Sequence, residues 1–200
     1  MSMQCPNCGD AVPQQIGQVA MLTCPSCATT LYLDGARLRD AGQAGIVHDA
    51  PQLFRIGQTV RLGRVKFTAR GQAQFSYGRG WWDEFWGTTA GGEARWVSVD
   101  EGDIVMQQPL DARPPVRRSS RVGTAFEFDG AEWRVTETGE GECIALRGSF
   151  GDRLLVGDRY AYVNAESGGR LLSGEFRGSE QSWFLGQWFD PFEIAIEADP

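Results

Sequence analysis

An internal repeat constrains the fold more than any other feature of this chain. Residues 55–67 align without a gap onto residues 121–133, at an offset of 66. In both copies large apolar residues alternate with polar residues or glycine, as in a half-buried strand, a tight turn and a second strand. The corresponding apolar positions are Val60, Leu62 and Phe67 in the first copy and Phe126, Phe128 and Trp133 in the second.

The repeat continues at an offset of 76, where the stretch beginning at Trp86 resembles the stretch beginning at Tyr162. The second copy therefore carries about ten extra residues, which we place around 148–158. Between the copies, residues 111–119 combine two prolines with several charges, a composition that cannot continue a central strand. We expect a first β unit at 51–110, a linker at 111–119 and a related second β unit at 120–197, each a small sheet or barrel-like unit.

Composition favours an all-β protein. The chain has 26 glycines among 200 residues, and glycine weakens helices while supplying the positive φ angles of tight turns. Its apolar content of 42% and charged content of 22% are those of a folded, globular chain. No window is long and apolar enough for a membrane span, and no basic region followed by an apolar stretch opens the sequence. We therefore expect a cytoplasmic protein.

Four cysteines near the N-terminus have the spacing of a metal site. Cys5 and Cys8 form one Cys-x-x-Cys pair, and Cys24 and Cys27 form another. Each tight turn directs two sulfurs at one point, which predicts a zinc ribbon over residues 1–34, with a linker at 35–50. Four thiolates fill a tetrahedron, so we expect one structural Zn²⁺. A rubredoxin-like iron site and a pair of disulfides are the alternatives, the latter disfavoured in a reducing cytosol.

The ribbon lacks the basic residues that nucleic-acid binding requires. Residues 1–34 contain neither Lys nor Arg, and the whole chain has a net charge of −7. Phosphate contacts need basic side chains, so we expect no nucleic-acid partner. The ribbon surface then either docks a protein or serves as a passive structural cap.

No catalytic constellation is visible in the sequence. His48 is the only histidine and falls in the expected linker, while Cys143 lies in an apolar strand and is expected to be an inert, buried thiol. Neighbouring carboxylates such as Asp83 and Glu84 are typical of solvated faces. A glycosidase pair would need a carboxylate separation that a sequence does not reveal. We expect no catalytic residues and no enzymatic activity.

Three tryptophans and a phenylalanine crowd residues 81–86. In a strand, Trp82, Glu84 and Trp86 would point one way, and Trp81, Asp83 and Phe85 the other. Such a strand is either sandwiched between two apolar layers or offers one face to a partner. Large residues matched between the copies favour a core of Trp86, Trp96, Trp133 and Tyr162. Trp81, without a counterpart, is the candidate for an exposed contact, and Trp188 could belong to a second interface patch.

These residues resemble a known family. The hairpin opening at residues 55–57, the Trp82-Asp83-Glu84-Phe85 stretch, the Arg95-Trp96 pair and Glu101-Gly102 look like an uncharacterised bacterial domain of unknown function, often preceded by a Cys-x-x-Cys ribbon. The resemblance implies a gene neighbourhood of spermidine-synthase-like proteins, small membrane proteins and membrane-stress proteins, and no assigned catalytic residues. The second copy lacks the Trp-x-Glu-Phe signature, so the copies need not share one ligand.

Two hypotheses of function follow. The first is a non-catalytic scaffold or adaptor that binds a protein partner through its ribbon and exposed aromatic surface, in a membrane-stress or polyamine-linked system, where a membrane protein is one kind of partner. The alternative is a module that binds a polyamine-type cation by charge and cation–π contact. The candidate binding residues for both are Trp81, Trp82, Asp83, Glu84 and Trp188.

Overall fold

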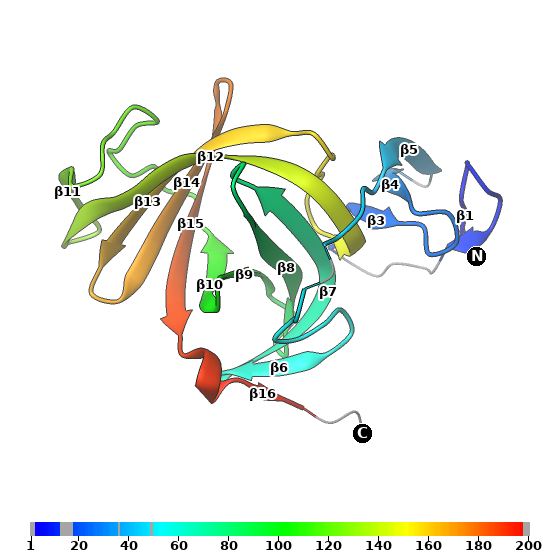
Figure 1. The fold of residues 1–200 in the computed structure, drawn as a ribbon, viewed down its shortest axis with the longest axis horizontal. Coiled ribbons are helices and arrows are strands. Elements are labelled where there is room, and N and C mark those ends of the chain that lie inside the picture. Colours follow the sequence, from blue (N-terminus) through cyan, green and yellow to red (C-terminus); the bar gives the residue numbers. More distant parts are fainter. Residues whose placement is uncertain (1–2, 13–17, 36, 49, 198–200) are drawn as a thin grey trace.

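Strands make up nearly all of the regular secondary structure, as the glycine-rich composition predicts. The computed structural model describes residues 3–12, 18–35, 37–48 and 50–197, and Figure 1 shows a large body of curved strands with a smaller N-terminal unit beside it. Within the described residues the one helical element is the 3-10 turn η1, Pro191–Glu193. No helix there has the length and apolar character needed to cross a bilayer.

The N-terminal unit consists of two small antiparallel sheets. β1 pairs with β2, and β3, β4 and β5 form a meander. The strands are β1 Met3–Gln4, β2 Ala11–Val12, β3 Met21–Thr23, β4 Thr29–Asp34 and β5 Arg37–Gln43. The expectation that residues 35–50 form a linker is wrong at β5, because this strand pairs along β4. Asp34-Gly35, a dipeptide typical of hairpin turns, starts this connection, with Gly35 at a φ of 60°.

The two repeats each contribute one short strand followed by four long ones. In the first copy these are β6 Thr59–Leu62, β7 Val65–Ser76, β8 Trp81–Thr89, β9 Ala94–Asp100 and β10 Asp103–Pro109. In the second they are β11 Ala125–Phe128, β12 Ala131–Phe150, β13 Arg159–Ser167, β14 Arg170–Arg177 and β15 Glu180–Phe189, and β16 Ala195–Ile196 then pairs with β6. β6 and β7 begin 66 residues before β11 and β12, as the repeat predicts.

The eight long strands close into one ring. Neighbours in the ring run β7-β8-β9-β10-β15-β14-β13-β12, and β12 returns to β7. All these pairs are antiparallel, and each copy supplies four adjacent strands. β12 closes the ring because it is 20 residues long: its first half pairs with β13, and its second half pairs with β7 (Figure 1). The two β units therefore form one body.

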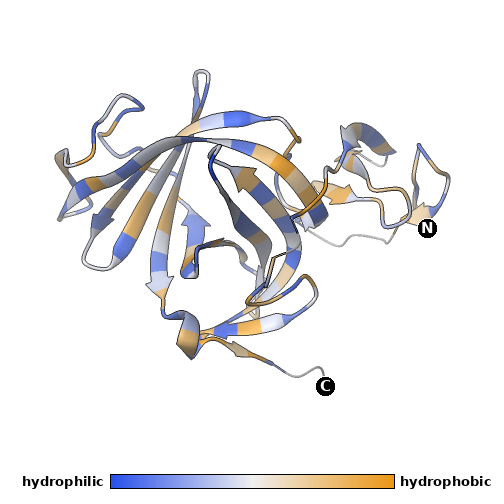
Figure 2. Ribbon diagram, in the orientation of Figure 1, coloured by the Kyte–Doolittle hydropathy of each residue, from blue (hydrophilic) through white to orange (hydrophobic). Residues whose placement is uncertain are grey.

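Alternation along the strands divides the side chains between the inside and the outside of the ring. Figure 2 shows that apolar and polar residues alternate along the ribbons. Outside, each copy covers its own half with a hydrophobic cluster, one centred on Phe67 and Phe85 and one on Trp133 and Trp183. Inside, a third cluster that includes Trp86 and Phe150 fills part of the ring.

The N-terminal unit is joined to the ring by backbone and side chains. β3 pairs with the end of β12, where Leu22 lies opposite Ser149 and Met21 opposite Phe150. Met21 is buried in the cluster inside the ring, and the Arg153 guanidinium lies 4.1 Å from the centroid of the Tyr32 ring. The ring and the ribbon therefore share a hydrophobic core.

Candidate functional site

The four N-terminal cysteines come together as their spacing predicts. Their Sγ atoms all lie within 4.8 Å of one another. Cys5 Sγ is 3.7 Å from Cys27 Sγ, and Cys8 Sγ is 3.8 Å from Cys24 Sγ. Sulfurs bound at about 2.3 Å to a tetrahedral ion lie roughly 3.8 Å apart, so the four thiols fit a single metal ion.

Two matching turns position these sulfurs. The amide of Gly9 donates to the carbonyl of Cys5, and the amide of Ala28 donates to the carbonyl of Cys24. In each turn the residue after the second cysteine has a positive φ, 79° at Gly9 and 56° at Ala28. The second turn holds a non-glycine residue in a conformation that glycine adopts at less cost.

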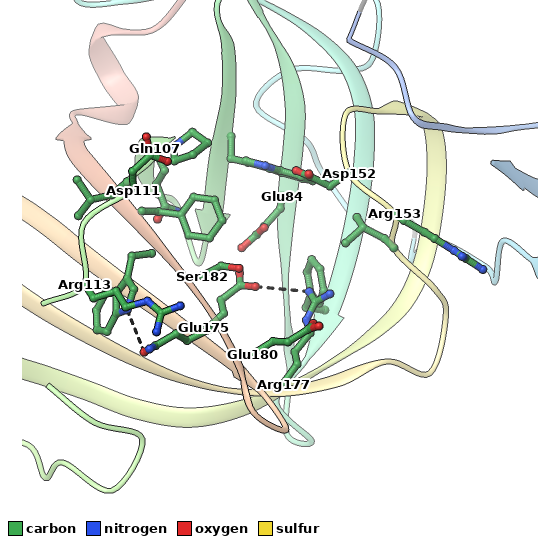
Figure 3. Close-up of a pocket in the computed structure, with 18 residues that line it drawn as sticks. Glu84, Gln107, Asp111, Arg113, Asp152, Arg153, Glu175, Arg177, Glu180 and Ser182 are labelled. Carbon is green, nitrogen blue, oxygen red and sulfur yellow. Dashed lines mark hydrogen bonds and ion pairs between the residues drawn. The ribbon is translucent and has the colours of Figure 1, made fainter. Parts of the chain in front are cut away.

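Two pockets that share part of their lining lie inside the ring, and together they form a cavity with two lobes. The larger lobe has a volume of about 500 Å³ and is drawn in Figure 3; the smaller has about 210 Å³. The lobes share only Glu84 of β8, Gln107 of β10 and Glu175 of β14. These three side chains therefore form the waist of the cavity.

Glycines on β12 leave room for the aromatic wall of the smaller lobe. A Cβ on Gly141 would lie 2.6 Å from the Trp82 indole, and one on Gly139 would lie 2.5 Å from the Tyr162 hydroxyl. Both rings thus lie against the backbone of β12, where a larger residue would displace them. Trp82 also stacks on Phe75, with ring centroids 5.3 Å apart.

Hydrogen bonds fix Glu84 at the waist. Its Oε1 accepts from the Trp82 indole N–H at 3.0 Å and from the Ser98 hydroxyl at 3.3 Å. The side-chain amide of Gln107 donates to the same hydroxyl at 2.9 Å. Burial raises the pKa of Glu84, and these hydrogen bonds oppose part of that rise.

Glu175 faces Glu84 from the opposite side of the ring. Figure 3 shows the two carboxyl groups turned toward one another, with Arg177 next to Glu175. Arg177 Nη2 lies 3.4 Å from Glu175 Oε2. Burial, and then the charge of Glu84, raise the pKa of Glu175 to about 8 in spite of this arginine.

Two buried acceptors in the cavity wall have no hydrogen-bond partner among the described residues. They are Oε1 of Gln107, a residue only 7% exposed, and Oδ1 of Asn164. Orphaned buried polar atoms are costly, so each is a place where a donor from outside the chain would be stabilised.

The smaller lobe is acidic and aromatic. Asp100, Asp103 and Glu137 line its outer part, and none of its lining residues is Arg, Lys or His. Burial and then Glu101, Glu137 and Asp103 raise the pKa of Asp100. The aromatic residues of the lobe are Tyr77, Trp82, Tyr160, Tyr162 and Trp188.

The candidate residues from the sequence fall on both faces of the sheet. Trp82, Glu84 and Trp188 line the smaller lobe together. Trp81 lies on the outer face, 39% exposed, where it stacks on His48 at a centroid distance of 4.6 Å. Asp83 is buried on that outer face and accepts hydrogen bonds from Gln72 and Gln52. The expectation that neighbouring carboxylates mark solvated faces is wrong at Asp83 and Glu84.

The crowded strand β8 is sandwiched between two layers. Phe85 packs in the outer cluster, while Trp86 packs inside. The predicted core residues Trp86, Trp96 and Trp133 are buried, whereas Tyr162 lines the cavity. Cys143 is buried, as predicted, and burial raises its pKa to about 12.

Three residues of the second copy that line the cavity were not among the candidates from the sequence. They are Tyr160 on β13 and Glu175 and Arg177 on β14, strands that lie across the ring from β8. One sequence signal could have indicated Glu175. On residues 170–177 the strand alternation places Ser173 and Glu175 on the same face as the apolar Leu171, which indicates polar side chains on an inward face. Their approach to Glu84 follows only from closure of the ring.

Residues 55–191 match the sequence profile of a family described as "Domain of unknown function (DUF4178)". The matched segment begins at the first repeat and contains every strand of the ring. No curated protein and no solved structure matches the chain.

Proposed function

The chain belongs to the DUF4178 family, and we propose that this member is a binding module whose ring interior holds a small, positively charged amine. The observation that supports this most is the smaller lobe, where acids and aromatic rings surround a site without a basic side chain. Orphaned acceptors in the wall call for a ligand rich in donors. An alkylammonium ion supplies charge, N–H donors and an apolar chain.

Two groups of acids suit a ligand with more than one ammonium group. Glu84 and Glu175 lie at the waist, and Asp100, Asp103 and Glu137 lie further out in the same lobe. Aromatic residues line the space between, where methylene groups could pack. A linear polyamine has this alternation of charge and hydrocarbon.

Titration calorimetry with spermidine at low ionic strength tests the proposal. We expect saturable binding to the wild type and a loss of at least about tenfold in affinity for Glu84→Gln, which removes one charge at the waist. Trp81→Ala serves as a control because Trp81 lies outside the ring. Heats that do not differ between the wild type and Glu84→Gln would remove this function.

We also propose that the ion in the cysteine site is Zn²⁺ and that its role is structural. Four thiolates leave no coordination position for water, and the cluster that packs around them is small, with Val12, Leu22 and Leu31 as its buried aliphatic members. Elemental analysis of the purified protein should give one zinc per chain. Iron would instead colour the protein.

A second candidate function is that of a scaffold or adaptor for a protein partner, in a membrane-stress or polyamine-linked system. The observation in its favour is the exposed pair formed by Trp81 and His48. A pull-down from host cells with the wild type and with Trp81→Ala tests it. The adaptor hypothesis requires a partner that the wild type recovers and the variant does not.

A further inference from the structure

We infer that the empty cavity holds one proton shared between Glu84 and Glu175, and that an incoming ammonium group displaces it. This inference rests on the proposed amine-binding function and adds its regulation. Amine capture would then be coupled to proton release, and the site would bind more tightly as the pH rises.

The placement of the two carboxyl groups is the first support. They reach the waist from β8 and β14, on opposite sides of the ring, and turn toward one another (Figure 3). The Glu175 side chain is only 18% exposed. Two like charges enclosed in one small space repel, so one proton retained between them lowers the energy of the empty site.

The neighbouring charges do not neutralise both carboxylates. Among the residues that the structure describes, Arg177 is the one cation next to the pair, and its side chain is one-third exposed. Asp152, from the connection between β12 and β13, adds a negative charge that opposes Arg177. A single arginine shared among three carboxylates leaves the pair short of positive charge.

Two other titratable neighbours of the pair, Tyr160 on β13 and Cys143 on β12, stay neutral near pH 7. Burial raises the pKa of Tyr160 far above its ordinary value and that of Cys143 to about 12. The remaining charged residues of the larger lobe are Asp111, Arg113, Arg153 and Glu180, and Arg153 lies over the Tyr32 ring. Glu84 and Glu175 are therefore the carboxyl groups of this lobe whose pKa burial raises.

The exchange balances in charge and protons. At pH 7 one proton stays on Glu175, since burial and the facing Glu84 raise the pKa of Glu175 to about 8. An ammonium group placed between the carboxyls favours ionisation of both, and one proton leaves to solvent. Affinity should rise about tenfold per pH unit below pH 8 and level off above it.

Calorimetry with spermidine in two buffers of different ionisation enthalpy measures the protons released. We expect close to one proton per ligand at pH 7 for the wild type. Glu84→Gln and Glu175→Gln remove the repulsion, so proton release should fall to near zero in both. Glu180→Gln is the matched control, because it removes the same charge from the cavity wall without touching the pair, and it should keep the release.

The shared proton can also be observed without any ligand. Infrared difference spectra of the empty protein at pH 7 should contain a protonated-carboxyl band that both Gln variants lose and Glu180→Gln keeps. Absence of this band in the wild type overturns the inference. Spermidine binding with no dependence on the buffer overturns it too while leaving the proposed function standing. The band without spermidine binding removes the proposed function and the displacement that rests on it, and leaves only the shared proton.

Discussion

Trp82 donates its indole N–H to Oε1 of Glu84 over 3.0 Å. The two residues are two apart on β8 and therefore share a face of the strand. The indole also stacks on Phe75. The Trp82 side chain therefore lines the cavity and at the same time positions the Glu84 carboxyl at its waist. An aromatic–acid pair of this kind recognises a cation through two contacts that reinforce one another.

Replacing Trp82 with Phe keeps a ring but removes the donor. Glu84 then loses a hydrogen bond to its ionised form, which should raise its pKa further and weaken spermidine binding by about tenfold, or roughly 1.4 kcal/mol. Calorimetry at pH 7 measures the change. Trp81→Phe, on the neighbouring outward-facing residue, should leave the affinity unchanged; an equal loss in both variants would contradict the role of the indole.

The stability of the empty protein should depend on pH through Glu175. Its pKa is about 8 in the folded chain, above the ordinary value of 4.5, so its contribution to stability is complete below pH 4.5 and is lost as the pH rises through 8. As the pH rises from 5 to 8, the Tm of Glu175→Gln should therefore increase relative to that of the wild type, by about 2–4 °C for each kcal/mol of unfolding free energy that the wild type loses. Scanning calorimetry of both proteins at pH 5 and at pH 8 checks this. Equal changes in Tm for the two proteins would contradict it.

Removing the metal should weaken the ring as well as the ribbon. Met21, the first residue of β3, is buried in the core inside the ring. Removing one such side chain from a core lowers the free energy of unfolding by about 2–5 kcal/mol. A chelator should lower the unfolding free energy of the whole chain by this amount, as measured by urea denaturation. Cys24→Ser should show the same loss and no further response to the chelator. If neither the chelator nor Cys24→Ser alters the unfolding curve of the ring, the ribbon is an independent unit.

The two cysteine turns allow a reciprocal test of backbone strain. Ala28 has a φ of 56°, so Ala28→Gly should stabilise the ribbon by about 0.5–1 kcal/mol. Gly9 has a φ of 79° and open space where a Cβ would lie, so Gly9→Ala should destabilise it by a similar amount through conformation alone. Thermal denaturation of the metal-bound protein measures both. Changes of the same sign would point to contacts rather than to φ.

The sequence was sufficient for features encoded by short spacings. Two Cys-x-x-Cys turns brought four sulfurs together, and the gapless repeat located β6, β7 and their counterparts β11 and β12. Alternation also predicted that Trp82 and Glu84 share a face. Each of these depends on residues close together in the chain, where backbone geometry leaves little choice.

The cavity depends on contacts that no local pattern encodes. Glu84 and Glu175 are far apart in sequence and meet because β7 pairs with β12 and β10 with β15. Asp83 looked like a partner of Glu84, yet the pleat turns it to the outside, where two glutamines satisfy it. β5 was missed because its residues are mostly polar and exposed and lack the apolar alternation of a strand; they pair along the open edge of β4.

The order of strands in the ring also bears on its ancestry. Each copy meets the other through like edges: the first long strand of one pairs with the first of the other, and the last with the last. A gene encoding a single copy would make a half-ring with two bare edges, and two such chains could complete each other about a twofold axis. Fusion of that homodimer into one polypeptide would free the two halves to diverge, so that Glu84 of one half now faces Glu175 of the other at different positions of the repeat.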